Sequence, residues 1–207
     1  MLEARNISFS YGKGKLILQN ISLAIKPGER LGIFAPSGFG KTTLLKILGG
    51  YEKPLKGKVL VEGRPLKEQG YCPVQMIFQH PECAVNPKRK MREVLKEGGK
   101  IGNGVLERLG IVEDWKNRYP QELSGGELQR FCIARALGEG TKYLLADEIS
   151  AMLDLIAQGQ IWKFLTEETE KRQIGMVIVS HSRQLLDHVC TRQIALKKES
   201  DRESVEV

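Results

Sequence analysis

The stretch Ala35-Pro36-Ser37-Gly38-Phe39-Gly40-Lys41-Thr42-Thr43 lies between two apolar segments. Residues 31–34, before it, read as a short buried strand, and residues 44–48, after it, are apolar at helical spacing. A strand, a glycine-rich loop ending in Gly-Lys-Thr and a helix, in this order, indicate a phosphate-binding loop. In such a loop, successive backbone N–H groups and the first turn of the helix surround an anion. The alternative is an ordinary strand-turn-helix with a lysine at the turn by chance.

The side chains of the loop have the types that phosphate binding requires. We expect Lys41 to reach the β- and γ-phosphates as a point charge, and the Thr42 hydroxyl to hold Mg²⁺. Gly38 and Gly40 let the backbone approach the phosphates without a Cβ in the way. Ala35 stands where the pattern begins with glycine, and alanine is costly there only if φ must be positive. We therefore predict a negative φ at Ala35 and a working loop.

The bulk properties indicate one folded unit spanning 1–207. The chain has 207 residues, of which 41% are hydrophobic and 28% charged, as in ordinary globular proteins. It has no apolar run long enough to cross a bilayer and no signal-peptide pattern at its start, so we expect it in the cytosol. The net charge of +7 is spread along the chain, and its densest cluster, residues 88–90, lacks interleaved aromatics. We therefore favour a solvated basic surface and expect no nucleic-acid partner.

The four cysteines, Cys72, Cys83, Cys132 and Cys190, are far apart and form no C-x-x-C pair. They have no histidine at ligand spacing. We interpret them as reduced, mostly buried thiols rather than as a zinc site.

The apolar patterns predict an α/β fold. The expected strands cover residues 2–10, 16–25, 31–34, 58–61, 74–78, 143–146 and 176–179. The expected helices cover residues 44–48, 91–95, 105–111, 125–137 and 156–169. The first strand alternates between apolar and polar residues, which suggests an antiparallel N-terminal lobe, whereas the later apolar runs suit a mostly parallel sheet. We expect residues 1–79 and 137–207 to form the core and residues 80–136 an inserted helical lobe, followed by a frayed charged tail from Lys197.

Polar residues follow three of the buried strands. Asp147 and Glu148 end the run of residues 143–146, at the edge where parallel sheets place ligands. Because neighbouring residues of a strand point to opposite sides, we expect Asp147 to bind Mg²⁺ and Glu148 to deprotonate an attacking water. Gln79 and His181 also follow buried strands, so we expect them to converge on this edge. A solvated strand end is the alternative for either acid alone, and a structural role is the alternative for the lone histidine.

The segment Leu-Ser-Gly-Gly-Glu-Leu-Gln-Arg, residues 123–130, opens a helix. Ser124 and Glu127 have the spacing of a capping box, so the segment has a purely structural interpretation. Gly125 and Gly126 argue against that interpretation, because glycine costs about 1 kcal/mol inside a helix and a cap does not require it. They suit a helix N-terminus that another group approaches closely.

Taken together, these motifs resemble the ATP-binding subunits of ABC transporters. The resemblance extends from Tyr11 to about Leu196, and its most specific motif is Leu-Ser-Gly-Gly-Glu at residues 123–127, the signature of the family. The phosphate loop, Gln79, the signature, the acids after residues 143–146 and His181 come in the order of the family. The resemblance implies ATP and Mg²⁺ as ligands.

The resemblance also implies roles for individual residues. Tyr11 would stack on adenine, Gln79 would contact Mg²⁺ or the attacking water, and His181 would hold the γ-phosphate in register with Glu148. Two ATPase subunits would face each other head to tail, and the signature of one would close over the ATP held by the other. The residues implied to hold ATP are Tyr11, Pro36, Ser37, Gly38, Phe39, Gly40, Lys41, Thr42, Thr43, Ser124, Gly125, Gly126 and Glu127.

Residues 80–87 and 118–122 resemble the peptide and nickel importer group. Four departures from the family pattern are Ala35 for Gly, Ile149 for Pro, Ala151-Met152 for Ser-Ala, and Ser182 for Asp. The carboxyl-terminal extension that is typical of the peptide group is also absent. The main chemical groups are all present, so we expect hydrolysis.

The leading hypothesis is an ATPase subunit that energises a membrane importer for peptides, nickel or a metal chelate. It would sit on the cytoplasmic side of the membrane, with the helical lobe docked on a permease. Two alternatives stay open. One is a soluble ABC-type ATPase in a non-transport complex, and the other is a degenerate, non-hydrolysing half of a heterodimer.

Overall fold

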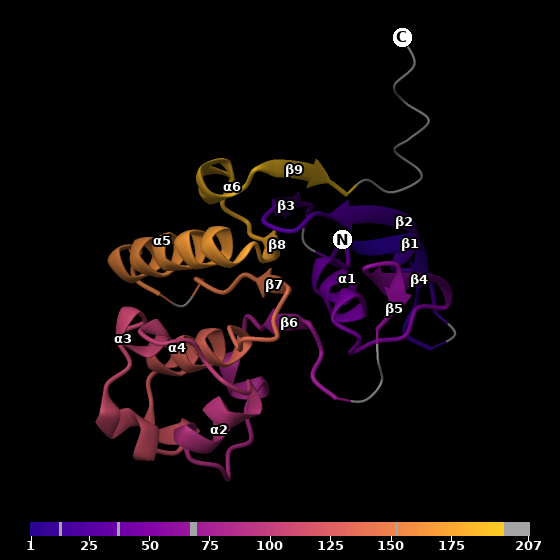
Figure 1. Ribbon diagram of the computed structural model, residues 1–207. Coiled ribbons are helices and arrows are strands. Elements are labelled where there is room, and N and C mark those ends of the chain that lie inside the picture. Colours follow the sequence, from indigo (N-terminus) through magenta and orange to yellow (C-terminus); the bar gives the residue numbers. More distant parts are fainter. Residues whose placement is uncertain (13, 37, 67–69, 152, 197–207) are drawn as a thin grey trace.

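The computed structural model describes residues 1–12, 14–36, 38–66, 70–151 and 153–196 (Figure 1). The expectations for Ser37, Met152 and the tail from Lys197 fall outside the described residues. The strands are β1 (Leu2–Phe9), β2 (Leu18–Ile25), β3 (Arg30–Phe34), β4 (Lys56–Val61), β5 (Arg64–Pro65), β6 (Val74–Ile77), β7 (Tyr143–Asp147), β8 (Gly175–Val179) and β9 (Arg192–Ala195). The α-helices are α1 (Lys41–Leu48), α2 (Met91–Glu97), α3 (Val105–Arg108), α4 (Gly125–Ala136), α5 (Leu155–Arg172) and α6 (Arg183–Val189). Short 3₁₀ helices are η1 (Pro81–Cys83), η2 (Glu113–Asn117) and η3 (Pro120–Glu122).

The strands form two sheets. One is antiparallel, in the order β2-β1-β4-β5, and confirms the antiparallel N-terminal lobe. The other is parallel throughout, in the order β6-β7-β8-β3-β9. Because all strands of the second sheet run the same way, the carboxyl ends of β3, β6, β7 and β8 meet at one edge.

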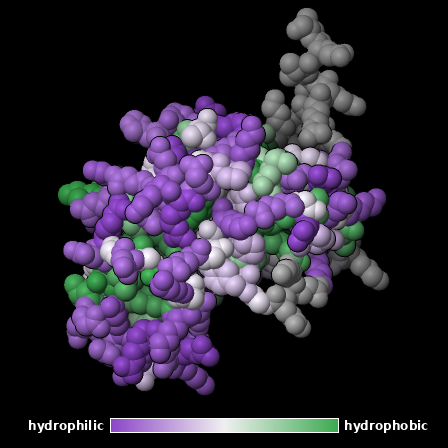
Figure 2. Space-filling model, viewed as in Figure 1, coloured by the Kyte–Doolittle hydropathy of each residue, from purple (hydrophilic) through white to green (hydrophobic). Residues whose placement is uncertain are grey.

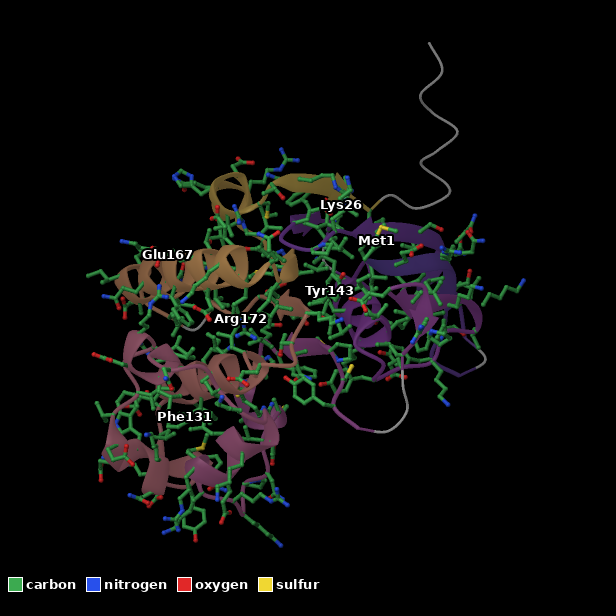
Figure 3. All side chains as sticks on the ribbon, viewed as in Figure 1. Met1, Lys26, Phe131, Tyr143, Glu167 and Arg172 are labelled. Atoms are coloured by element: carbon green, nitrogen blue, oxygen red, sulfur yellow. The ribbon has the colours of Figure 1, made fainter. Side chains whose placement is uncertain are left out.

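Two apolar cores lie on the two faces of the parallel sheet. Strand β7 contributes to both, because its residues alternate between the faces and all are buried. Leu144 and Ala146 pack with the helices α2 to α5, whereas Tyr143 and Leu145 pack with α1 and the antiparallel sheet. Figure 3 shows Phe131 deep in the helical part and Tyr143 at the junction with the sheets. This burial explains why residues 143–146 read as a continuous apolar run.

Residues 81–136 form helices and contribute no strand to either sheet (Figure 1). This helical segment shares an apolar core with α5, and one arginine adds a polar contact between them. The guanidinium of Arg108, at the end of α3, lies 4.7 Å from the ring centre of Phe164 and pairs with Glu167 and, at 3.6 Å, with Glu168. The contact therefore joins a short helix of the segment to the long helix of the core.

The boundaries of several elements differ from the prediction. The helix predicted over residues 105–111 ends at Arg108, because Gly110 takes a left-handed φ of 66°. Helix α5 extends beyond the predicted residues 156–169 in both directions and stops where Gln173 turns left-handed, with φ 54°. Glu62 and Gly63 form a tight turn between β4 and the two-residue strand β5. Helix α6 and strand β9 were not predicted.

The cysteines are free thiols, but they are less buried than predicted. Cys132 is buried, Cys72 and Cys190 are partly buried, and Cys83 is exposed. Burial raises the pKa of Cys132 to about 11 and that of Cys190 to about 11. Among the described residues, no group of histidine, cysteine and acidic side chains is arranged to hold a metal. None of the described helices combines the length and the apolar character that crossing a membrane requires.

Candidate functional site: the phosphate loop and the carboxyl edge of the parallel sheet

The glycine-rich loop joins β3 to α1, as the sequence predicts. Gly38 and Gly40 have φ of 77° and 82°, values that side-chain-bearing residues rarely adopt. Gly40 is also needed for space, because a Cβ there would lie 2.6 Å from Cγ2 of Ile17. Ala35 is buried and is not among the described non-glycine residues with positive φ, which confirms the prediction for that position. The loop therefore keeps its turn without a glycine at its first residue.

Lys41 lies inside the loop that precedes it. Its side chain is buried, and Nζ donates hydrogen bonds to the carbonyl oxygens of Ala35, at 2.9 Å, and Pro36, at 3.1 Å. These bonds compensate the cost of burying an ammonium group. They also place the charge beside the backbone that would surround a phosphate.

Tyr11 lies beside the first turn of α1. Its ring packs edge-on against Phe9, with centroids 4.9 Å apart, and its hydroxyl lies 3.4 Å from the Thr43 Oγ1. The residue remains 51% exposed. The ring thus covers part of the core and still offers surface next to the phosphate loop.

Asp147 ends β7 and is almost completely buried, at 2% exposure. Burial is the main cause that raises the pKa of its carboxyl group, and the charge of Glu148 adds to this effect. A hydrogen bond from the Thr42 side chain and the charges of Lys41 and Lys46 lower the pKa and offset part of the shift. One oxygen, Oδ1, is buried without a hydrogen-bond partner among the described residues.

The residues at this point fit a hard divalent cation. Mg²⁺ takes oxygen ligands and is usually held by one or two protein groups together with phosphate oxygens and water. The free Oδ1 of Asp147 and the hydroxyl of Thr42 are such oxygens, and they lie next to each other. A cation here would also remove the penalty of an unpartnered buried carboxylate oxygen.

Glu148 is held between two polar residues from neighbouring strands. Gln79, after β6, donates from Nε2 to Oε2 of Glu148 at 3.2 Å, and Nε2 of His181, after β8, lies 2.8 Å from Oε1. The predicted convergence of Gln79, Glu148 and His181 on one edge is confirmed. The side chain of Glu148 is 15% exposed and that of His181 is 57% exposed, so the cluster opens toward solvent on the histidine side.

The reason given for the different directions of the two acids was wrong. Glu148 does not continue the strand; its φ is 48°, in the left-handed region, and its backbone N–H donates to the carbonyl of Val179 at 3.0 Å. The left-handed turn, rather than strand alternation, separates Glu148 from Asp147. Non-glycine residues with this conformation are uncommon and often belong to functional sites.

The segment of residues 123–127 forms the predicted capping box. The Ser124 hydroxyl accepts from the backbone N–H of Glu127 at 3.3 Å, and the Glu127 carboxylate accepts from the backbone N–H of Ser124 at 2.8 Å. Gly125 and Gly126 are the first two residues of α4. In Figure 1, α4 lies on the far side of β6 and β7 from α1. Within one chain the structure therefore does not bring this helix to the phosphate loop.

Sequence reasoning missed residues that support the cluster. Gln129 of α4 is 3% exposed, and its Nε2 donates to the carbonyl of Phe78 at 3.3 Å. Trp162 of α5 donates from Nε1 to Oγ of Ser150 at 3.1 Å. Gln129 stands among the apolar residues of the buried face of α4, and a polar residue in that position was the available signal.

The fold and the site define a phosphate-loop nucleotide-binding protein. The family model described as ABC transporter matches residues 18–151. The chain belongs to this family, and it is one of its ATPases.

Curated relatives match almost the whole chain. The nickel import system ATP-binding protein NikE of Staphylococcus aureus (strain bovine RF122) is 33% identical over 210 residues, covering 95% of this chain and 87% of the relative. The nickel import ATP-binding protein NikE of Escherichia coli O6:K15:H31 is 29% identical over 223 residues, covering 95% of this chain and 83% of the relative.

Solved structures share the fold over almost the whole chain. A dimeric ATP-binding cassette in a post-hydrolysis state, bound to ADP and Pi, has a TM-score of 0.81 and 27% identity, covering 95% of this chain and 94% of that chain. The cbiO1 protein of Clostridium perfringens, part of the ABC transporter complex cbiONQ, has a TM-score of 0.76 and 25% identity, covering 95% of this chain and 84% of that chain.

Proposed function

We propose that this chain is the ATP-binding and ATP-hydrolysing subunit that energises a membrane importer, with nickel, a metal chelate or a peptide as its cargo. The observation that carries the proposal is Glu148, held between Gln79 and His181 beside a phosphate loop. The similarity to two nickel import ATP-binding proteins supports the importer and the choice of cargo.

Glu148 is proposed as the general base. It lies at the open edge of the sheet with both carboxylate oxygens in contact with neighbours, so its direction is fixed before a water arrives. Gln79 would orient that water, and His181, on the exposed side, would contact the γ-phosphate. Mg²⁺, held by Thr42 and Asp147 with Gln79 nearby, would neutralise charge on the phosphates. The chain's own part is therefore to position groups and to accept one proton.

The phosphate loop is proposed to hold the nucleotide. Residues 36–43, including Ser37, would surround the phosphates with backbone N–H groups, and the ammonium of Lys41 would turn from its carbonyl partners to the β- and γ-phosphates. Tyr11 would stack on the adenine ring, for which its exposed surface is available.

A second ATPase subunit, identical or related, is proposed to complete the site. Because α4 and α1 lie on opposite sides of β6 and β7, the Ser124–Glu127 motif would not reach a nucleotide held by the phosphate loop of its own chain. The dimeric cassette bound to ADP and Pi, which shares the fold, supports a dimer. In a head-to-tail pair, this motif would cover the nucleotide of the partner.

The helical segment of residues 80–136 is proposed to form a lobe that docks a permease on the cytoplasmic side of the membrane. It carries a hollow of about 520 Å³ whose apolar lining includes Ile101, Leu106, Ile111 and Val112. Figure 2 shows hydrophobic surface gathered over this part of the molecule, within a mostly hydrophilic face. Such a surface suits an amphipathic helix of a partner.

The Glu148→Gln variant tests the proposed chemistry. It should bind ATP in the presence of Mg²⁺, lose turnover and accumulate as an ATP-bound dimer, because only the base is removed. Calorimetry measures the binding, phosphate release the turnover, and light scattering the dimer. Glu139→Gln, a matched change at an exposed acid paired with Lys100, should hydrolyse ATP like the wild type. Full turnover by Glu148→Gln would exclude Glu148 as the base.

Co-purification tests the importer. Tagged protein extracted from membranes in mild detergent should bring an integral membrane permease with it. Recovery of a purely soluble assembly would contradict the importer and favour a non-transport ABC ATPase.

A further inference from the structure

Three side chains of α4 hold three backbone carbonyls in sequence. Nε2 of Gln129 donates to Phe78 O at 3.3 Å, Sγ of Cys132 donates to Pro81 O at 3.9 Å, and Nη1 of Arg135 donates to Ala84 O at 2.8 Å. Donors and acceptors both advance by three residues at each step, and every pair is 51 residues apart in the chain. We call these three contacts the carbonyl ladder.

The ladder spans the segment that carries Gln79. Strand β6 ends at Ile77 and η1 begins only at Pro81. Phe78 and Gln79 therefore belong neither to the parallel sheet nor to a helix. The first rung is the bond from Gln129 to Phe78, directly before Gln79, and the second follows at Pro81. The residues on both sides of Gln79 are therefore attached to α4.

Two of the donors are buried. Gln129 and Cys132 are 3% and 2% exposed, so water is not an alternative partner for either side chain. The thiol contact, at 3.9 Å, is the weakest rung, because a thiol is a poor hydrogen-bond donor. The third rung is charge-assisted, and the same Arg135 nitrogen also pairs with Glu97 of α2 at 3.0 Å. Loss of any rung would leave a carbonyl without its partner.

We propose that Gln129, Cys132 and Arg135 are positioning residues that make the Gln79 segment and helix α4 one unit. Helix α4 begins at the capping box of Ser124 and Glu127, so a displacement of Gln79 is passed along the ladder to that motif. In the opposite direction, the ladder sets where Gln79 meets Glu148. This inference rests on the proposed function, because it concerns how nucleotide bound at the phosphate loop changes the position of the signature, residues 123–127.

The main test is a double-mutant cycle on the full chain. Gln129→Leu removes the first rung and keeps the side-chain size. We expect kcat for ATP to fall roughly tenfold while the affinity for ATP stays unchanged, because Gln79 is misplaced and the phosphate loop is untouched. In the Gln79→Ala background, Gln129→Leu should cause no further loss. A merely structural residue would lower activity to the same extent in both backgrounds.

Two matched controls separate position from stability. Thr141→Val removes a buried hydrogen bond to the other end of α4, where Thr141 donates to Ala136 O at 2.8 Å, and should leave kcat unchanged. Arg135→Met breaks the third rung, whereas Arg89→Met removes only the other partner of Glu97, at 3.2 Å, and should have no effect on kcat. If Gln129→Leu does not fold, the comparison of Arg135→Met with Arg89→Met still tests the carbonyl ladder.

The outcomes are distinguishable. If the wild type hydrolyses ATP and the ladder variants do so equally well, or lose activity in the Gln79→Ala background too, the ladder has no positioning role although the proposed function stands. If the wild type neither binds nor hydrolyses ATP, the proposed function is wrong and the inference is wrong with it.

Discussion

Replacing Asp147 by asparagine should make the nucleotide-free protein more stable and its complex with Mg²⁺ and ATP less stable. The carboxyl group is 2% exposed, and burial raises its pKa. Because the folded pKa lies above the unfolded value of about 3.9, the folded state binds the proton more tightly than the unfolded state. The ionised form therefore destabilises the fold at neutral pH, and this penalty disappears as the pH falls below the unfolded pKa.

The size of the effect follows from the burial of the charge of Asp147, because an amide would still place a polar atom at the position of the unpartnered Oδ1. Incomplete partnering of a buried group costs about 1–3 kcal/mol, and more when the group is charged. The hydrogen bond from Thr42 and the charges of Lys41 and Lys46 offset part of this cost. We expect a net gain of about 1 kcal/mol for the neutral amide, which raises the Tm of a domain of this size by about 2–4 °C.

Saturating ligand should reverse the order of the two proteins. ATP with Mg²⁺ at a hundred times Kd adds about 2.7 kcal/mol to the wild type, or about 5–11 °C in Tm. Asparagine is a weaker ligand for Mg²⁺ than a carboxylate, so the variant should gain much less. Thermal unfolding followed by circular dichroism, first with a chelator and then with ATP and Mg²⁺, measures both differences.

A second aspartate provides the control. Asp154 caps α5 by accepting from the backbone N–H of Ala157 at 2.9 Å, and it is exposed. Asparagine caps a helix about as well as aspartate, so Asp154→Asn should change neither Tm. If Asp147→Asn lowers the Tm of the nucleotide-free protein near neutral pH, the carboxylate is not penalised there and the reasoning is refuted.

Further predictions concern charge, thiols and the helical segment. Lys41→Ala should weaken ATP binding by roughly 10- to 100-fold in calorimetry, since a charge-assisted hydrogen bond contributes about 1.5–3 kcal/mol, and unchanged affinity would contradict the loop assignment. Under mildly alkaline conditions iodoacetamide should label exposed Cys83 in the folded protein, whereas Cys132, with its pKa near 11, should react only after unfolding, as peptide mass spectrometry can show. Arg108→Ala should lower Tm by about 2–4 °C through loss of its ring stacking and ion pairs, whereas Lys100→Ala, at an exposed pair, should have no measurable effect.

Local patterns were enough to predict the phosphate loop and the buried strands. The order of strand, glycines, lysine and helix is contiguous in the chain, so residues 31–48 contain all the information about their own arrangement. The run of residues 143–146 was predictable because a parallel strand buried on both faces is apolar throughout. The convergence of Gln79, Glu148 and His181 followed from placing each residue after such a strand.

Features that depend on distant contacts were not predictable in the same way. The left-handed φ of Glu148 accompanies a backbone hydrogen bond to Val179, which is remote in sequence. Strand β9 pairs with β3 at the sheet edge, and its exposed residues carry little apolar signal. The role of Gln129 was hidden for a related reason, since its acceptor is a carbonyl and not a side chain.

Among the described residues, two buried side-chain atoms have no hydrogen-bond partner, and both are acceptors: Oδ1 of Asp147 and Oε1 of Gln129. Proteins rarely leave such atoms unsatisfied, because each costs free energy that the fold does not recover. Asp147 has its free atom where a cation would bind, so binding would remove the cost. Gln129 has its free atom at the first rung beside Gln79, where a shift of the segment changes the neighbours of the amide. The described residues thus leave acceptors unsatisfied at the two places to which we assign cation binding and the positioning of Gln79. If both proposals hold, ligand binding would favour another position of α4.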